Sequence, residues 1–157
     1  MPRRIDYYDD PEAPEANSRV PSVNVVVVND RDEVLVIRRT DNDNWAVPGG
    51  AIDLGESVPA AAIRETEEET GITCEITGIA GIYSDPRHVI LYTSDGEARQ
   101  EFSIVLTARP VSGEPRTSDE SRDVRWVPKA EVAELRMDPS MRLRLAHYLN
   151  GAVPHIG

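Results

Sequence analysis

Three glutamates near the middle of the chain are spaced so that they can act together. Glu65, Glu68 and Glu69 are three and four residues apart, so a helix of about 3.6 residues per turn places them within one quadrant of its surface. Like charges at these spacings repel one another, and near the C-terminus of a helix they also oppose its macrodipole. Converging carboxylates are the ligands that hard divalent cations such as Mg²⁺ prefer. Taken alone, this spacing is more typical of an acidic helix face exposed to water, and the alternative is a metal site.

The residues around these glutamates favour the metal site. The segment from Gly50 to Ile72 resembles the Nudix box, Gly-x5-Glu-x7-Arg-Glu-U-x-Glu-Glu-x-Gly-U, in which U is a bulky aliphatic residue. The seven fixed positions of the box are filled by Gly50, Glu56, Arg64, Glu65, Glu68, Glu69 and Gly71. A chance match to seven specified positions has a probability on the order of 10⁻⁸ to 10⁻⁹ at average residue usage. By this resemblance the chain is identified as a member of the Nudix hydrolase family.

One position departs from the box. Thr66 stands where the box has an aliphatic residue, whereas Ile72 fills the other aliphatic position. We expect residue 66 to face the core beneath the helix, where the threonine methyl packs and the hydroxyl bonds back to the helix backbone. The departure should lower stability slightly and leave the chemistry intact.

The resemblance implies an activity and a cofactor. Nudix enzymes are typically pyrophosphohydrolases that cleave a nucleoside diphosphate linked to another group, with water attacking a phosphorus atom. Mg²⁺ or Mn²⁺ is needed because cations must offset the charge of both the carboxylates and the substrate. The resemblance implies Glu65, Glu68 and Glu69 as metal ligands, and the backbone carbonyl of Gly50 as a further ligand.

The resemblance also assigns roles beside the metal. Arg64 and Glu56 match the pair within the box that orients the ligating glutamates. Arg64 is therefore counted with Glu65 and Glu69 among the catalytic residues. Members of the family differ in which carboxylate is the general base, so Glu65 and Glu69 both stay open for that role.

A further carboxylate ligand is expected from a loop. Several family members add one shortly before a late tryptophan, which here is Trp126. Glu120 lies six residues before Trp126 and is our choice for this ligand. Glu97 and Glu101 are its rivals.

The substrate is indicated by weaker signals. Pro86 lies 15 residues after Gly71, and a proline at that distance beyond the box is a marker of family members that cleave ADP-ribose. We therefore expect ADP-ribose or a related nucleotide sugar, and the alternative is a (d)NTP pyrophosphohydrolase that clears damaged nucleotides. The residues expected near the substrate are Arg38, Arg39, Arg87 and Arg99 as phosphate contacts, together with Trp45 and Pro86.

Two other functions are consistent with the fold that the box implies. A non-catalytic, nucleotide-sensing Nudix domain tends to lose glutamates of the box, and none is lost here. An isomerase of isoprenyl diphosphates calls for a catalytic cysteine and glutamate, and Cys74, just past the helix, is poorly placed for that role. Hydrolysis is therefore the favoured activity.

The box must be held by the elements around it. Residues 22–29 and 33–39 are rich in aliphatic side chains and flank a polar turn, which predicts a β-hairpin. Ser57 and Gly71 are suited to cap the two ends of the box helix. Further strands are expected at residues 45–50, 74–82, 88–92, 101–108 and 124–127, and further helices at 129–135 and 138–150. The resemblance covers residues 20 to 149 and implies an α/β fold, the Nudix α/β/α sandwich, with a mixed sheet and the box as a loop–helix–loop.

The two ends of the chain carry separate expectations. Residues 1–19 contain five acids and three prolines, which predicts an irregular acidic N-terminal arm ahead of a Nudix domain at 20–157. Met141, Leu145 and Leu149 recur every four residues on one face of the last helix, a pattern typical of a core or dimer contact. The arm and this stripe together suggest a homodimer.

Composition limits the partners. The chain has 157 residues, with 28 acidic and 17 basic side chains and a net charge of −11. This charge disfavours proteins that coat nucleic acid or bind anionic membranes. Cys74 is the one cysteine, and the start of the chain lacks the apolar stretch of a signal peptide, which together predict a cytoplasmic protein. The expected partner is therefore a small nucleoside diphosphate derivative, with no nucleic acid and no membrane.

Overall fold

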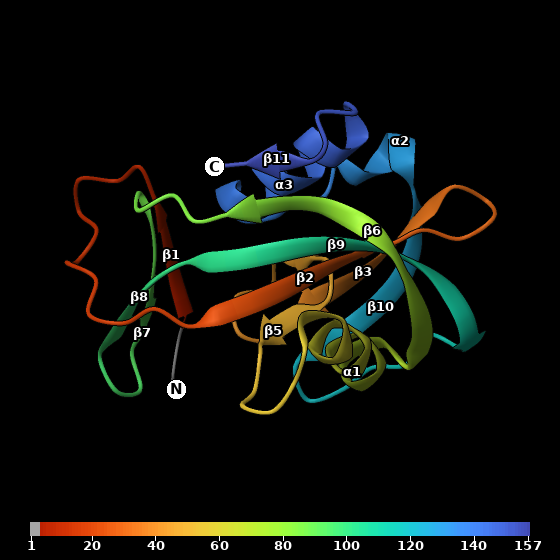
Figure 1. The fold of residues 1–157 in the computed structure, drawn as a ribbon, viewed down its shortest axis with the longest axis horizontal. Coiled ribbons are helices and arrows are strands. Elements are labelled where there is room, and N and C mark those ends of the chain that lie inside the picture. The colour runs from red at the N-terminus through yellow and green to blue at the C-terminus, as the bar shows by residue number, and fades with distance from the viewer. Residues whose placement is uncertain (1–3) are drawn as a thin grey trace.

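The computed structural model describes residues 4–157 and has helices on both sides of a central sheet (Figure 1). Its elements in chain order are β1 (Arg4–Tyr8), β2 (Pro21–Val27), β3 (Glu33–Arg39), β4 (Trp45–Ala46), β5 (Gly49–Ala51), α1 (Val58–Thr70), β6 (Ile72–Tyr83), β7 (His88–Tyr92), β8 (Glu97–Gln100), β9 (Phe102–Gly113), β10 (Ser121–Pro128), α2 (Lys129–Val132), α3 (Pro139–Leu149) and β11 (His155–Ile156). The strands β1, β8 and β11 have no counterpart among the sequence predictions.

The strands of the described residues form three sheets. The largest is mixed and has the order β11-β6-β9-β2-β5, in which β2 is parallel to β9 and antiparallel to β5. A second sheet has the order β10-β3-β4, and a third has the order β1-β7-β8. A mixed sheet with helices on its faces confirms the α/β fold class.

The central strand β2 is apolar because both of its faces are covered. Val23, Val25 and Val27 pack with alanines of α1 in one core cluster, whereas Val26 packs with the Met141 and Leu145 side chains of α3 in another. Successive side chains of a strand point to opposite faces, so this run serves both helix layers at once. The valine run therefore places α1 and α3 on opposite sides of the sheet.

The predicted hairpin is wrong, although both of its strands exist. β2 and β3 are joined at the turn by a bridge between Val28 and Val34 and by a hydrogen bond from the Asn29 N–H to the Glu33 carbonyl, 3.1 Å long. Beyond the turn they separate, because β2 pairs with β9 and β5 while β3 pairs with β10 and β4. Aliphatic runs show that a segment is a buried strand, but they do not determine which strand it pairs with.

The ends of α1 are fixed as the sequence predicts. The Ser57 hydroxyl accepts a hydrogen bond from the Ala60 N–H, 3.2 Å long, and Gly71 ends the helix with a left-handed φ of 78°. A Cβ at Gly71 would lie 2.6 Å from the carbonyl oxygen of Glu114, so glycine is required there for both reasons. Thr66 is fully buried, and its hydroxyl donates to the Ala62 carbonyl at 2.8 Å, as expected.

The prediction of an irregular N-terminal arm is wrong for residues 4–8. These residues form β1, which pairs antiparallel with β7 from Arg4 opposite Tyr92 to Tyr8 opposite His88. The acidic composition predicted solvation, but the Asp6 side chain is only 3% exposed, because Arg4 and His88 pair with it. Residues 4–8 are therefore packed against β7.

The three helices of the described chain are short. α3 begins at Asp138-Pro139 and ends at Asn150, as predicted. Met141 and Leu145 are buried in the core and Leu149 packs against it, so the stripe on α3 belongs to the interior of one chain and no longer supports a dimer. Within residues 4–157, no helix combines the length and the apolar character needed to cross a membrane.

Replacing Gly71 by alanine tests the end of α1. Gly55 is the control, because its φ is also left-handed, at 89°, and no heavy atom of the described chain lies within 4 Å of a Cβ built there. We expect Gly55→Ala to lower the free energy of unfolding by about 1–2 kcal/mol through backbone strain alone. Gly71→Ala should lose about 1–3 kcal/mol more through the clash with Glu114. Equal losses in urea unfolding would show that the clash is relieved without effect on stability.

Candidate active site

Three carboxylates converge at one end of α1. Glu65 and Glu69 come from α1 and Glu120 from the loop before β10, and one oxygen of each lies within 4.8 Å of the others. The backbone of Glu120 is anchored, because its carbonyl accepts a hydrogen bond from the Thr40 N–H, 3.1 Å long. No other group of this kind is found among residues 4–157. The structure thus brings Glu120, the loop residue chosen by its spacing, to two glutamates of the box.

The two rival loop glutamates lie elsewhere. Glu97 accepts hydrogen bonds from Arg99, at 3.0 Å, and from the Ser18 hydroxyl, at 2.6 Å. Glu101 is buried, and its carboxylate lies 3.8 Å from Arg144. Both carboxylates are engaged away from the cluster of Glu65 and Glu69.

Glu69 is the most buried member of the cluster, with 4% of its surface exposed. Burial raises the pKa of its carboxyl to about 8, and the charges of Glu65 and Glu120 add to this effect. Its Oε2 accepts a hydrogen bond of 2.9 Å from the Gly49 N–H, which acts in the opposite direction on the pKa. Burial also raises the pKa of Glu65. Carboxylates held together at this depth are stabilised by a hard divalent cation, so the donor set fits Mg²⁺ or Mn²⁺.

Gly50 makes room for the carboxylate of Glu65. Gly50 lies in β5 opposite Val23 of β2, and a Cβ built on it would lie 2.6 Å from the Glu65 carboxyl carbon. Any side chain at this position would therefore displace Glu65. The fixed glycine at the start of the box is explained by this close approach.

Arg64 holds Glu65 from the other side. Its Nε and Nη2 donate to the two carboxylate oxygens of Glu56 at 2.6 and 2.7 Å, and its Nη1 donates to Glu65 at 2.9 Å. The hydrogen bonds from Arg64 lower the pKa of Glu56 to about 2. The two-pronged contact with Glu56 fixes the guanidinium plane, and this plane in turn fixes the carboxylate of Glu65.

Glu68 is not brought into the cluster. Its side chain is 59% exposed, and its carboxylate accepts a hydrogen bond of 3.2 Å from Arg64. It lies on the same side of α1 as Glu65 but toward the solvent. Of the three box glutamates expected to bind metal, two converge and the third stays at the rim.

Of the two neighbouring arginines expected near the substrate, Arg39 lines a cavity and Arg38 does not. Arg39 lines this cavity beside β5, and its positive charge acts to lower the pKa of Glu69. Its guanidinium also donates to Asp41 at 2.7 Å. Arg38 donates to Asp43 at 2.6 Å and does not line this cavity.

Of the other expected substrate residues, Arg99 lines this cavity, whereas Trp45, Pro86 and Arg87 lie away from it. Trp45 packs against the core, with the Arg125 guanidinium 5.4 Å from its ring. Pro86 lies in the turn between β6 and β7, beside residues 9–16. Arg87, in the same turn, donates to Asp85 at 2.6 Å. The structure does not bring these three residues to the cluster of carboxylates.

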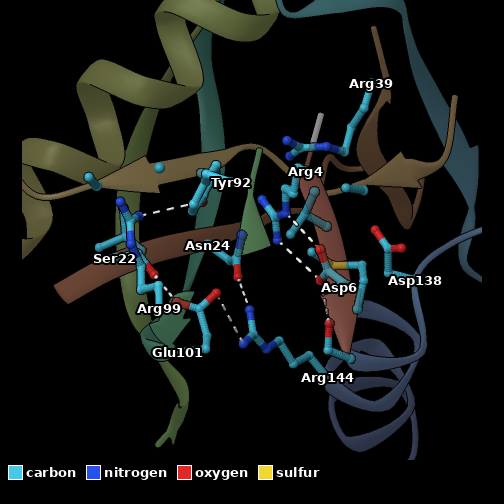
Figure 2. A pocket seen from close by; sticks show the side chains of 18 residues that line it. Arg4, Asp6, Ser22, Asn24, Arg39, Tyr92, Arg99, Glu101, Asp138 and Arg144 are labelled. Carbon is cyan, nitrogen blue, oxygen red and sulfur yellow. Dashed lines mark hydrogen bonds and ion pairs between the residues drawn. The ribbon is translucent and has the colours of Figure 1, made fainter. Parts of the chain in front are cut away.

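A polar cavity of about 80 Å³ borders β5 (Figure 2). Gly49 and Gly50 line it with their backbones, so the strand that contacts Glu65 and Glu69 also forms a wall of the cavity. Its charged lining consists of Arg4, Arg39, Arg99 and Arg144 with Asp6, Glu101 and Asp138. Four cations against three anions make this cavity less acidic than the chain as a whole.

Most of this cavity was missed by sequence reasoning. Arg4 and Asp6 come from the segment that was expected to be irregular, so no pattern indicated them. Two signals were available for other residues, because Asn24 interrupts the valine run of β2 and Arg144 lies in the apolar stripe of α3. A polar residue on an otherwise buried face indicates a polar site inside the fold.

The comparisons with known proteins agree with this geometry. The family model of the NUDIX domain matches residues 18–148. A MutT-like protein of Streptomyces ambofaciens is 37% identical over 135 residues, which cover 86% of this chain and 80% of that protein. A solved NUDIX hydrolase from Nitrosomonas europaea shares the fold with a TM-score of 0.74 at 19% identity, covering 90% of this chain and 78% of that one.

Two further relatives have names that state a substrate. A protein of Bacillus subtilis named putative 8-oxo-dGTP diphosphatase is 28% identical over 82% of this chain and 78% of its own length. An ADP-ribose pyrophosphatase of Methanocaldococcus jannaschii is 31% identical over 75% of this chain and 68% of its own length. This chain belongs to the Nudix family and is a Nudix pyrophosphohydrolase.

Gly50→Ala tests the close approach of Glu65. The clash is with the flexible end of a side chain, so we expect the fold to persist while Glu65 moves out of the cluster. The rise in melting temperature on adding Mg²⁺ should then be lost. The control is Gly78→Ala in β6, where a Cβ would meet only the Thr107 hydroxyl at 3.2 Å. An unchanged Mg²⁺ response in Gly50→Ala would contradict this reading of the glycine.

Arg64→Lys tests the orienting pair. Lysine keeps the charge but cannot bond both oxygens of Glu56 and Glu65 at once. We expect the affinity for Mn²⁺, measured by calorimetry, to fall by about 10- to 100-fold. The control is Arg109→Lys, because Arg109 makes an exposed ion pair of 2.7 Å with Glu75 on a different part of the molecule. Equal Mn²⁺ affinities in the two variants would show that Arg64 does not position a ligand.

Proposed function

We propose that the chain is a Mg²⁺-dependent enzyme that cleaves a nucleoside diphosphate linked to another group. The observation that carries this proposal is the convergence of Glu65, Glu69 and Glu120. These three carboxylates, with the Gly50 carbonyl, would hold the ion, and Glu68 would ligate from the solvent rim. When bound, the metal supplies Lewis-acid polarisation of phosphate oxygens and acidifies water.

The protein residues act around that centre. Arg64 holds Glu65 in place, and Glu65 and Glu69 are the candidates for the general base. Arg39 is proposed to contact the phosphates, because it lines the cavity next to the cluster. Retention of every glutamate of the box supports an enzyme over a nucleotide-sensing domain.

ADP-ribose or a related nucleotide sugar is the proposed substrate. The ADP-ribose pyrophosphatase from Methanocaldococcus jannaschii supports this choice, as does the polar lining of the cavity beside β5. Pro86 supports it only through its spacing, because it lies away from the cavity. The alternative, a (d)NTP pyrophosphohydrolase, is supported by the Bacillus subtilis relative named for 8-oxo-dGTP.

Glu69→Gln tests the metal-dependent activity. Loss of this ligand should remove several kcal/mol of transition-state stabilisation, or about 10³-fold or more in kcat. Without metal, the variant should be at least as stable as the wild type at pH 8, because a buried charge among like charges has been removed. The measurements are release of AMP from ADP-ribose and thermal unfolding with and without Mg²⁺.

The matched control is Glu67→Gln, which changes the same residue type on the opposite side of α1. Its activity and its response to Mg²⁺ should equal those of the wild type. Full activity of Glu69→Gln, or of the wild type in excess chelator, would refute the metal site. A comparison of kcat/KM for ADP-ribose, other nucleotide sugars, dGTP and 8-oxo-dGTP decides the substrate.

A further inference from the structure

Arg144 is a buried cation on α3, whose other buried residues are Ser140, Met141 and Leu145. It is 6% exposed and lies on α3 between Met141 and Leu145, both of which belong to the core. Arginine is almost never fully buried unless it is paired. Burial lowers the pKa of Arg144, with the charge of Glu101 acting against this effect. Packing alone does not explain a buried guanidinium at this position of α3.

The protein leaves most donors of Arg144 unused. A guanidinium carries five N–H donors. Within residues 4–157, the side chain of Arg144 donates one hydrogen bond, from Nη1 to the side-chain oxygen of Asn24. Its Nη2 lies 3.8 Å from Oε2 of Glu101, which is too far for a hydrogen bond. The guanidinium also lies 5.2 Å from the centre of the Tyr83 ring, and its remaining N–H groups are open to a ligand that enters the cavity.

The pair of Arg144 and Glu101 faces the cavity beside β5. Figure 2 shows the guanidinium pointing toward Asn24 and Glu101, with the dashed line to Glu101 marking the long ion pair. The other oxygen of Glu101 accepts from the Ser22 hydroxyl and from the Phe102 N–H, at 3.2 and 3.1 Å. Oε2 of Glu101 and Nη2 of Arg144 are thus the atoms left to meet a ligand.

The chemistry of this gap selects a hydroxyl group. An oxygen placed about 2.8 Å from both atoms can accept from Nη2 and donate to Oε2 at the same time. A phosphate or carboxylate oxygen has no proton to give to Glu101, and a methyl group satisfies neither atom. Arg4 and Asp6 form a second pair of opposite charge in the cavity wall, and this pair is closed by a hydrogen bond of 2.8 Å. Two pairs of opposite charge suit a neutral group rich in hydroxyls.

We propose that Arg144 and Glu101 are specificity-determining residues that bind a hydroxyl of the sugar attached to the far side of the scissile pyrophosphate. The proposal rests on the proposed function, since it places the pyrophosphate at the glutamate cluster and the sugar in the cavity across β5. It selects nucleotide sugars over nucleoside triphosphates. It also gives β1, which lies outside the residues matched by the family model, a part in the substrate site through Arg4 and Asp6.

The test compares two substrates in one double variant. Arg144→Met alone would leave Glu101 buried and unpaired, so Arg144→Met is combined with Glu101→Gln to remove both charges. The substrates are ADP-ribose and the β-methyl ester of ADP, in which a methyl group replaces the terminal ribose. We expect KM for ADP-ribose to rise about 10- to 100-fold with kcat nearly unchanged, because charged hydrogen bonds are lost. KM for the methyl ester should stay as in the wild type.

The melting temperature separates recognition from structure. Replacing both members of a buried ion pair by uncharged residues often leaves the stability unchanged or raises it. The double variant should therefore have a melting temperature equal to or above that of the wild type. The matched control is Arg109→Met with Glu75→Gln, which removes an exposed pair of the same two residue types. This control should leave KM unchanged for both substrates.

A binding measurement separates this proposal from the proposed function. Ribose 5-phosphate is titrated into the metal-free proteins by calorimetry. Binding to the wild type and loss of binding in the double variant support the sugar site even where hydrolysis fails. Equal kinetic losses for both substrates, an unchanged KM for ADP-ribose, or equal binding of ribose 5-phosphate by the two proteins would overturn it.

Discussion

The repulsion among carboxylates held together at one end of α1 is the constraint around which this protein is built. Glu69 is buried, Glu65 is half-buried, and Glu120 approaches both from a loop, so the site is electrostatically unfavourable without a cation. The surrounding residues keep the three carboxylates close together. The Gly49 N–H bonds Glu69, Gly50 leaves space for Glu65, and Arg64 balances part of the charge. This arrangement supports the proposed binding of a divalent cation.

The same constraint explains how an acidic protein handles a polyanionic substrate. The net charge of −11 argues against binding phosphates through the protein surface alone. Three of the 28 acidic side chains, Glu65, Glu69 and Glu120, lie together where a metal would offset their charge. Across β5 the lining changes to arginines, most of them paired with carboxylates, so the cavity is polar with little net charge. One short strand thus borders both the carboxylate cluster and the polar cavity.

The parts of this account that the sequence predicted are those encoded locally. The limits of α1 follow from Ser57 and Gly71, and the box glutamates follow from spacing along one helix. The choice of Glu120, which the structure places beside Glu65 and Glu69, came from the family resemblance and from its distance to Trp126. Pairing between distant segments was not predictable, which is why the hairpin of β2 and β3 was wrong. Aliphatic strands of this kind pair equally well with several partners, and the choice is made by the whole sheet.

The N-terminal segment was misjudged for a related reason. Its acids and prolines are typical of a solvated arm, yet Arg4 and Asp6 neutralise each other, and β7 offers β1 an edge to pair with. Likewise, the stripe on α3 showed a buried face without showing that the face is covered within one chain. Arg144 was visible in that stripe as an exception, and its meaning emerged only when Asn24 and Glu101 were found beside it.

The central claim is that Glu65, Glu69 and Glu120 bind one divalent cation. The most direct measurement is anomalous diffraction from crystals of the protein soaked in Mn²⁺. We expect a strong anomalous peak in contact with carboxylate oxygens of all three residues, and its disappearance in Glu69→Gln crystals soaked in the same way. A peak elsewhere with these three residues unliganded, or no peak at saturating Mn²⁺, would contradict it.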